Sequence, residues 1–385
     1  MKRGSIGADM GADVGAGLGE GRPDACEGEG RRQGLKRLLG GALGAASLGL
    51  PAGLRPAWAQ ASGASSGASG PGTSAAQANW PIFVLNSLEA SVSVIDPVRW
   101  VETARLPTGK EPHHLYLTPD ETSLLVGNAA SNSITVLDPR TAQVQRTLVD
   151  IIDPYHLRFS PDMQWFVTAA NRLDHVDIYR WNRSQPAQPF ELKKRLSAPK
   201  TPSHISIDAG SRTAYITLQD SDELLAIDLA TQAVVWKRAI GKMPADVYMA
   251  PDQRHLYVAL TGERHVAVLD LAAPGGPALR PRIETDAGAH AFRAMGDGRH
   301  VFVSNRSANT ISLLDTHTHS VVSRLPGPSG PDCMELLADR RHLLVTSRWA
   351  GKLSVIDITT RTVVRQVRVG RSPHGVWTLG HARGA

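Results

Sequence analysis

The chain has 385 residues, a formal net charge of +6 and a hydrophobic content of 42 %, which fits one large globular domain or two ordinary ones. The positive charge is mild and scattered, so it does not indicate nucleic acid binding. The two cysteines, Cys26 and Cys333, lie in very different segments, which excludes a disulfide framework. The 36 glycines and 25 prolines fall between short apolar runs, a pattern that favours many strands and turns over long helices.

Residues 1–59 have the layout of a signal peptide. An arginine pair at residues 31–32 begins a basic stretch, and a weakly apolar Gly/Ala/Leu run follows over residues 38–50. The sequence Ala-Trp-Ala then offers a cleavage site between Ala59 and Gln60. The apolar run is too short and too rich in glycine to be a membrane span. We therefore expect an exported protein with no stable membrane insertion after cleavage.

The signal resembles the twin-arginine class. The arginine pair and the moderately hydrophobic, glycine-rich core are typical of it, although Gly34 stands where that class usually has Phe. An ordinary secretory signal with a chance arginine pair is the alternative. Either route predicts the periplasm as the destination. Residues 60–79 are rich in Ser, Gly and Ala, which predicts a flexible linker.

From residue 80 onward the chain repeats a motif with a period of roughly 40 residues, which is the signature of a repeat architecture. Each unit contains an apolar strand, a polar loop and a strand that ends in Asp. Residues 82–86 and 92–96 form one such pair, and residues 124–128 and 134–138 form the next. The third unit is degenerate and carries an insertion after Trp181. These short runs alternate or are fully apolar, which is typical of β-strands.

Seven such units predict an all-β fold, a seven-bladed β-propeller with four-stranded blades over residues 80–380, followed by a tail at 381–385. A small sheet of this kind cannot bury both faces alone, and radial packing of the sheets solves that problem. The chain starts with the second strand of a unit and ends with a lone first strand at residues 375–379. We expect this last strand to complete the N-terminal blade and close the ring, and we expect a monomer.

These repeats resemble the YVTN-type (YncE-like) family of β-propellers, over nearly all of the chain that follows the signal. The resemblance is specific for the fold and weak for function, because propellers host enzymes, scaffolds and sensors. More distantly, the repeats are similar to the d-type haem domain of nitrite reductases, which holds its cofactor with His and Arg. The hub of nitrous oxide reductases, where histidines hold copper, is a further resemblance.

Polar residues recur one or two positions after the proline that opens each innermost strand. In the fifth repeat Gly288 replaces the proline, which gives His290 the same position as His114. The repeat alignment brings them around one axis, where they are candidate metal ligands: His113, His114, His156, His204, Asp246, His290, Cys333 and His374. Imidazole suits copper, zinc and iron, and thiolate suits soft metals. The alternative is structural, because a histidine here can simply bond a neighbouring blade. Copper, zinc and haem all remain open as cofactors.

Three arginines are expected on the same face and are candidates for binding a cofactor or a small anionic ligand: Arg172, Arg306 and Arg348. Their alternative is a solvated rim. The sequence contains no Cys-x-x-Cys-His, no Walker loop, no Gly-x-Ser-x-Gly and no His-Glu-x-x-His.

Three functions remain open at this point. The first is a non-catalytic periplasmic propeller that binds a ligand, a cofactor or a partner protein on the His/Arg face. The second is a metal- or haem-dependent redox or cofactor-handling protein. The third is a lactonase-like hydrolase, for which His114, His204 and Asp246 would supply a cation site and a base.

Overall fold

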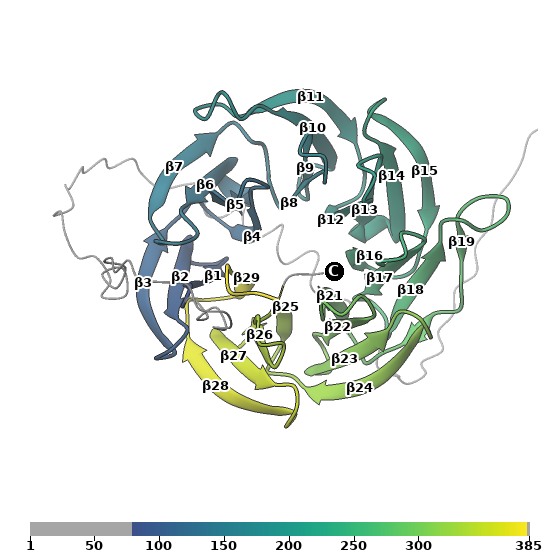
Figure 1. Ribbon diagram of the computed structural model, residues 1–385. Coiled ribbons are helices and arrows are strands. Elements are labelled where there is room, and N and C mark those ends of the chain that lie inside the picture. The colour runs from purple at the N-terminus through teal and green to yellow at the C-terminus, as the bar shows by residue number, and fades with distance from the viewer. Residues whose placement is uncertain (1–78, 383–385) are drawn as a thin grey trace, which may run out of the picture. The chain divides into compact units, whose positions relative to one another are not determined.

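Seven antiparallel sheets surround a common axis in the part of the chain that the computed structural model describes, residues 79–382 (Figure 1). The strands nearest the axis are β4, β8, β12, β16, β21, β25 and β29. The predicted signal peptide, almost all of the predicted linker, and residues 383–385 of the tail lie outside the described residues. The architecture is the predicted seven-bladed β-propeller.

The blades follow one another along the chain, and their strands run in order from the axis outward, β29 in blade 1 excepted. Blades 1 and 2 contain β29 (Pro373–Thr378), β1 (Ile82–Asn86), β2 (Ser91–Asp96) and β3 (Val101–Pro107), then β4 (Pro112–Leu117), β5 (Leu124–Asn128), β6 (Ser133–Leu137) and β7 (Val144–Val149). Blades 3 and 4 contain β8 (His156–Phe159), β9 (Trp165–Ala170), β10 (His175–Trp181) and β11 (Phe190–Ser197), then β12 (Pro202–Ile207), β13 (Thr213–Leu218), β14 (Glu223–Asp228) and β15 (Ala233–Ala239). Blade 5 contains β16 (Pro244–Met249), β17 (His255–Leu260), β18 (His265–Asp270), β19 (Ala278–Leu279) and β20 (Ile283–Glu284). Blades 6 and 7 contain β21 (Ala289–Ala294), β22 (His300–Asn305), β23 (Thr310–Asp315) and β24 (Ser320–Pro326), then β25 (Pro331–Leu336), β26 (His342–Ser347), β27 (Lys352–Asp357) and β28 (Thr362–Arg368).

Two short 3₁₀ turns interrupt the loops that follow second strands: η2 (Ala129–Ser131) and η3 (Gln219–Ser221). Within residues 79–382 no helix has the length and hydropathy needed to cross a bilayer.

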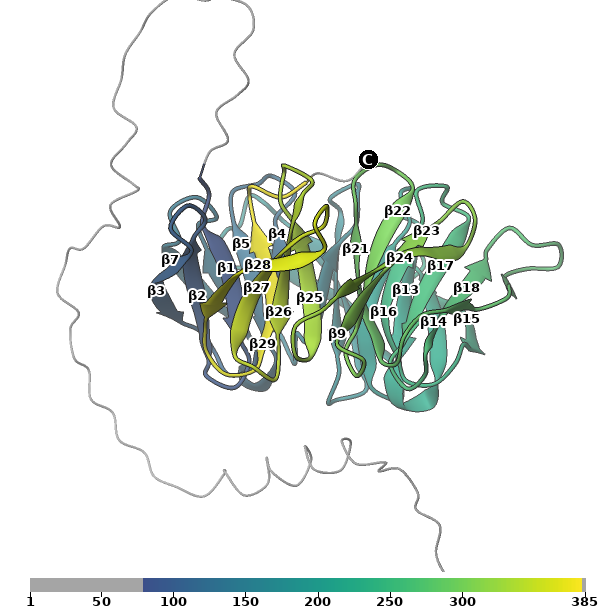
Figure 2. The ribbon, with the colours of Figure 1, turned by 90° about the horizontal axis from the view of Figure 1, so that it is seen from below.

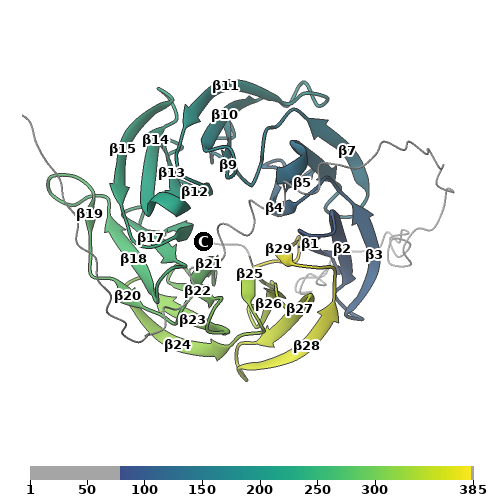
Figure 3. The same cartoon turned by 180° about the vertical axis from the view of Figure 1, so that it is seen from behind.

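The C-terminal strand closes the ring. β29 pairs antiparallel with β1, and Ile82 lies opposite Thr378 while Phe83 lies opposite Trp377. The N-terminal blade is therefore built from both ends of the described chain, as Figures 2 and 3 show from the side and from behind. This confirms the predicted closure. A closed ring leaves no innermost strand without a neighbour on either side.

The core lies between the blades. The second and third strands of most blades are buried along almost their whole length, because each face of a blade packs on the next blade. Between blades 3 and 4, for example, Val167 and Ile178 pack with Ile205 and Ile216. Each such buried side chain contributes about 1.5–3 kcal/mol relative to exposure. This two-sided burial explains why the strands read as short apolar runs.

The innermost strands begin with an irregularity that positions the site. In blade 2, Pro112 lies opposite Asn128 and Leu115 lies opposite Val126, so two residues of β4 face one residue of β5. That one residue is Gly127, where a Cβ would collide with the carbonyl oxygen of Pro154 in the next blade. Similar shifts occur at the start of β12, β16, β21 and β25. A bulge of this kind redirects side chains at the strand start.

Candidate functional site

Eight side chains from the starts of six innermost strands form what we call the hub cluster: His113, His114, His156, His204, His290, Asp332, Cys333 and His374. Five of the six histidines are buried, and His114 is half-buried. His374 and Asp332 have no exposed surface. The structure thus brings together all six histidines that the sequence predicts to lie around one axis.

The bulges arrange the hub cluster in two rows. The first row follows the strand's first residue directly and includes His113, His290, Asp332 and His374. The second row comes one residue later and includes His114, His204 and Cys333. His156 joins this row as the first residue of β8, which pairs with β9 in regular register without a bulge.

The register corrects the predicted position of His290. Ala289 pairs with Asn305 in blade 6 as Pro331 pairs with Ser347 in blade 7. His290 is therefore equivalent to Asp332 and belongs to the first row. The repeat alignment that equates it with His114 is wrong by one residue, because Gly288 was taken as the start of the strand.

The imidazole rings pack directly on one another. The ring centroids of His113 and His374 lie 3.7 Å apart, and His114 lies 4.5 Å from His156 and 4.7 Å from His204. His114 is also 4.7 Å from His374, so it joins the two halves of the cluster. Tilted and edge-on rings at these separations leave no slot between them for a planar macrocycle.

Three overlapping groups in the described chain place one ligand atom of each member within 4.8 Å of the others. Triad A consists of His113, His114 and His374, and triad B consists of His114, His156 and His204. The third group consists of His290, Asp332 and His374. Bonds of about 2.0–2.1 Å from a metal to imidazole nitrogen require donor atoms roughly 3.3–4.2 Å apart. A triad at 4.8 Å must therefore close by a fraction of an ångström around an ion.

Four hub nitrogens are buried and have no hydrogen-bond partner within residues 79–382: His113 Nδ1, His114 Nε2, His156 Nδ1 and His374 Nε2. The other nitrogen of His374 lies 2.9 Å from the carbonyl oxygen of His113, to which it must donate. The Nε2 atom of neutral His374 then carries a lone pair. An unpaired polar atom in the interior costs about 1–3 kcal/mol. Four unpaired nitrogens in one cluster are therefore available to a ligand.

Burial keeps these rings neutral. It lowers the pKa of His113, His114, His156 and His374 well below the ordinary value, and the neighbouring imidazoles lower it further. Burial also lowers the pKa of His204. Neutral imidazole is the form that binds metal ions, so the hub is ready to bind one at neutral pH.

Asp332 is a hub residue that is not among the predicted ligands. Its Oδ1 accepts a hydrogen bond from Arg306 Nη2 at 2.8 Å, and its Oδ2 accepts one from Arg348 Nη1 at 3.0 Å. Burial alone would raise its pKa, but Arg306 and the imidazoles of His374 and His290 hold the pKa well below its usual range. The signal in the sequence is that Asp332 shares a repeat position with His113 and His374.

His290 is held by the same arginine. Thr261 donates its hydroxyl hydrogen to the Ala289 carbonyl at 2.9 Å, so the contact of 3.2 Å between Thr261 Oγ1 and His290 Nδ1 is donated by the ring. Arg306 Nη2 contacts both His290 Nε2 and Asp332 Oδ1, and His290 Nε2 itself lies 3.0 Å from Asp332 Oδ1. Burial and Arg306 lower the pKa of His290 to about 3. In this third group the guanidinium already fills the place of a cation.

The predicted arginines are engaged within the protein. Arg306 and Arg348 pair with Asp332, and their side chains are only 15 % and 12 % exposed. Arg172 pairs with the buried Asp153 at 3.1 Å and donates to the carbonyl oxygen of Ala129, so its contacts lie outside the hub cluster. Each of the three arginines predicted to bind a cofactor is therefore already paired with an aspartate of the protein.

Two predicted ligands belong to none of the three groups. Asp246 accepts a backbone hydrogen bond from Val247 through Oδ1 and one from Phe292 through Oδ2, both at 2.8 Å. It therefore joins blade 5 to blade 6. Cys333 Sγ lies 3.5 Å from His374 Nδ1, and burial raises the pKa of its thiol well above the ordinary value. Without a bound cation the thiol therefore stays protonated at neutral pH.

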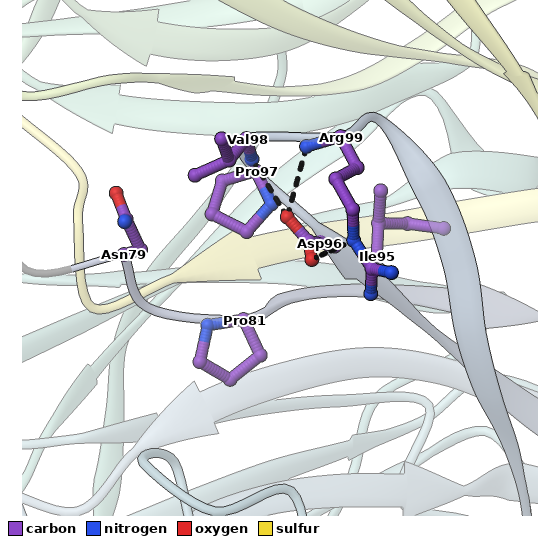
Figure 4. A pocket seen from close by; sticks show the side chains of 7 residues that line it. All are labelled: Asn79, Pro81, Ile95, Asp96, Pro97, Val98 and Arg99. Carbon is purple, nitrogen blue, oxygen red and sulfur yellow. Dashed lines mark hydrogen bonds and ion pairs between the residues drawn. The ribbon is translucent and has the colours of Figure 1, made fainter. Parts of the chain in front are cut away.

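The hollow in Figure 4 differs from the hub cluster in its chemistry. Asn79, Pro81, Ile95, Pro97 and Val98 give it a mainly apolar lining. Its acidic residue, Asp96, accepts hydrogen bonds from the backbone of Val98 and Arg99 and from the Arg99 side chain. Asp96 ends β2 and is a turn residue, because it bonds the backbone of the turn that follows.

Comparison with solved structures agrees with the fold. A protein of unknown function from Desulfotomaculum acetoxidans is 15 % identical, has a TM-score of 0.67, and covers 80 % of this chain with all of its own length. The dihydro-heme d1 dehydrogenase NirN is 18 % identical, with a TM-score of 0.60 and coverage of 80 % of this chain and 77 % of NirN. The periplasmic gluconolactonase PpgL of Pseudomonas aeruginosa is 18 % identical, with a TM-score of 0.63 and coverage of 77 % and 98 %. At these identities the likeness concerns the fold alone. A comparison with curated proteins gives no significant match.

The family of this chain is assigned by a family model that covers its repeats. A family model described as YNCE-like beta-propeller matches residues 42–384, which is most of the chain. The ring of seven blades, its closure by the C-terminal strand and this match agree with one another. The chain belongs to the YncE-like β-propeller family.

Proposed function

We propose that this chain is a non-catalytic metal-binding propeller whose hub histidines hold a transition-metal ion. The observation that carries the proposal is the set of four buried imidazole nitrogens without a partner, gathered in rings that touch one another. Imidazole ligands without carboxylate suit copper and zinc, and they suit calcium and magnesium poorly.

Charge favours a cation over an anion in triads A and B. A small anion would need protonated histidines, and burial works against protonation. The nearby guanidiniums of Arg306 and Arg348 are already paired with Asp332. Neutral lone pairs facing one another repel slightly, and a metal ion placed among them removes that repulsion.

The hub residues fit an ion better than haem. The ring centroids of His113 and His374 lie 3.7 Å apart. All five rings of triads A and B contact one another in one continuous set. A haem held between them would require these rings to separate. For a hydrolase, Asp246 is not available as the base, because both of its carboxylate oxygens are engaged by backbone amides.

The test is the metal content of the full chain, together with its visible spectrum. We expect copper or zinc in the purified protein, or uptake on soaking, and no Soret band. Replacing His114 and His204 together by Gln should abolish binding. The matched control is His300→Gln, because His300 lies outside the hub and bonds Asp297 at 2.7 Å. A protein that binds neither metal in any state would overturn the proposal and leave a partner protein or another ligand as the function.

We also propose that the chain is exported to the periplasm by its twin-arginine-like signal. The support is the arginine pair, the apolar run and the cleavage motif in the first 59 residues. Changing Arg31 and Arg32 to Lys should retain the protein in the cytoplasm, as cell fractionation would show. Unchanged export would favour the ordinary secretory route, and an uncleaved cytoplasmic wild-type protein would contradict export altogether.

A further inference from the structure

We propose that the hub holds two monovalent copper ions, one in triad A and one in triad B, with His114 shared between them. This inference rests on the proposed metal-binding function and adds the number, the position and the charge of the ions. The juxtaposition that carries it is the membership of His114 in both triads.

The hub offers more donors than one ion can use. Triads A and B together contain five different imidazoles, whereas an ion in a site of this kind takes three or four protein ligands. His114 lies at the junction, with ring centroids 4.5–4.8 Å from His113, His156, His204 and His374. A neutral imidazole has one lone pair, so His114 can serve two ions only as imidazolate, and its N–H proton is released to water when the second ion binds.

Each triad contains a histidine whose ring is oriented by a contact of its Nδ1 atom. His374 donates from Nδ1 to the carbonyl oxygen of His113, which directs Nε2 away from that bond. In triad B, His204 Nδ1 lies 2.9 Å from the hydroxyl of Ser203. Metal-binding histidines are typically fixed in this way by a bond from the other ring nitrogen. The two anchored rings belong to different triads, as two separate ion positions require.

The third group does not provide a further position. Arg306 Nη2 bonds both His290 and Asp332, and Arg348 bonds the second oxygen of Asp332. A metal ion there would stand against two guanidiniums. Within the described residues the count of ion positions is therefore two.

The charge of the groups around triads A and B favours monovalent over divalent copper. Triads A and B contain no carboxylate and no thiolate, and the one carboxylate beside them, Asp332, is outweighed by two arginines. Coulomb repulsion scales with the product of the charges, so two divalent ions at this separation would repel each other roughly four times as strongly as two monovalent ions. With one imidazolate as the anionic ligand in the two triads, this repulsion favours cuprous ions over zinc pairs or cupric pairs.

The experiment is an anaerobic titration of the full chain with cuprous ion, buffered by a chromogenic copper chelator. We expect two tightly bound ions in the wild type and one each in His113→Gln and His156→Gln, which belong to one triad each. His114→Gln should weaken both ions. His300→Gln should still bind two. Zinc in place of copper should give no more than one tightly bound ion.

Near-ultraviolet circular dichroism checks that each variant is folded, and His374→Gln and His204→Gln supply a second variant for each triad. A wild-type ratio of one, abolished alike by His113→Gln and His156→Gln, would overturn the two-ion inference and leave the single-ion function standing. A ratio of zero would overturn both. Two zinc ions bound as tightly as two copper ions would overturn the assigned charge.

Discussion

Histidines at the two ends of the innermost strands have opposite surroundings. At the hub, the rings of triads A and B contact one another, and four of their nitrogens have no partner within the described chain. At the opposite end, in the turns that lead into β17, β22 and β26, an Asp bonds the histidine that begins the strand three residues later, at 2.6–2.7 Å: Asp252 with His255, Asp297 with His300, and Asp339 with His342. We call these the opposite-end turns. The residue type is the same, and the available lone pairs distinguish a candidate ligand from a turn residue.

The same contrast holds for the carboxylates. Asp332 in the hub bonds two arginines whose side chains are 12–15 % exposed. Near the opposite-end turns, Asp270, Asp315 and Asp357 each accept hydrogen bonds from an arginine whose side chain is 47–55 % exposed, and Asp270 has a second exposed arginine, Arg280, at 3.9 Å. A paired charge surrounded by protein is costly to disrupt, because the partner is left buried and uncompensated, whereas an exposed partner returns to water.

The largest expected effect is therefore at Asp332. Asp332→Asn keeps the shape of the side chain and removes its charge, which leaves the guanidiniums of Arg306 and Arg348 buried together without a counter-ion. We expect a loss of about 3–5 kcal/mol in the free energy of unfolding, measured by urea denaturation.

Asp357→Asn is the matched variant, because Asp357 also bonds an arginine in the same blade, but an exposed one. Its loss should be clearly smaller than that of Asp332→Asn. Equal losses at the two positions would contradict the distinction between the hub and the opposite-end turns.

Copper should stabilise the ring to a smaller extent. His374 belongs to the closing strand β29, and His113 and His114 belong to blade 2, so an ion in triad A ties the closed blade to its neighbour. Free cuprous ion at about 100 times its Kd adds about 2.7 kcal/mol per ion, which raises Tm by a few degrees. Differential scanning calorimetry with and without copper measures the shift.

His114→Gln should lose that shift, and His300→Gln should retain it. If both variants respond to copper as the wild type does, the stabilising ion is bound outside the hub.

The fold could be predicted because the sequence repeats it. A period of about 40 residues and a lone strand at the C-terminus determine both the number of blades and the closure. The same repeats placed His114, His156 and His204 correctly, because their prolines mark the starts of β4 and β12 and the turn before β8.

The details of the hub depend on features that no single unit reveals. The bulge puts two consecutive residues near the axis, so a one-residue choice at Gly288 displaced His290 to the wrong row. Asp332 was missed because its role depends on Arg306 and Arg348, which come from two different blades and converge only when blades 6 and 7 pack together. Cys333 and Asp246 share the repeat position of His114, yet one thiol stays protonated and one carboxylate bonds the backbone.

The smallest expected effect concerns a single pair near the opposite-end turns. Hydrogen bonds from Arg254 are the main reason why the pKa of Asp270 is lowered to about 2. A carboxylate with a depressed pKa stabilises the folded protein above its unfolded pKa, and this contribution is lost as the pH falls through about 2. Arg254→Gln should raise the pKa of Asp270 by roughly one unit, followed by carboxyl NMR during an acid titration. Arg299→Gln, which removes the equivalent arginine of blade 6, should leave Asp270 unchanged. An unchanged pKa of Asp270 in Arg254→Gln would mean that the bond from the exposed Arg254 contributes nothing in solution. The difference between this pair and Asp332 would then be larger than we infer. A pKa shift of several units would make that difference smaller.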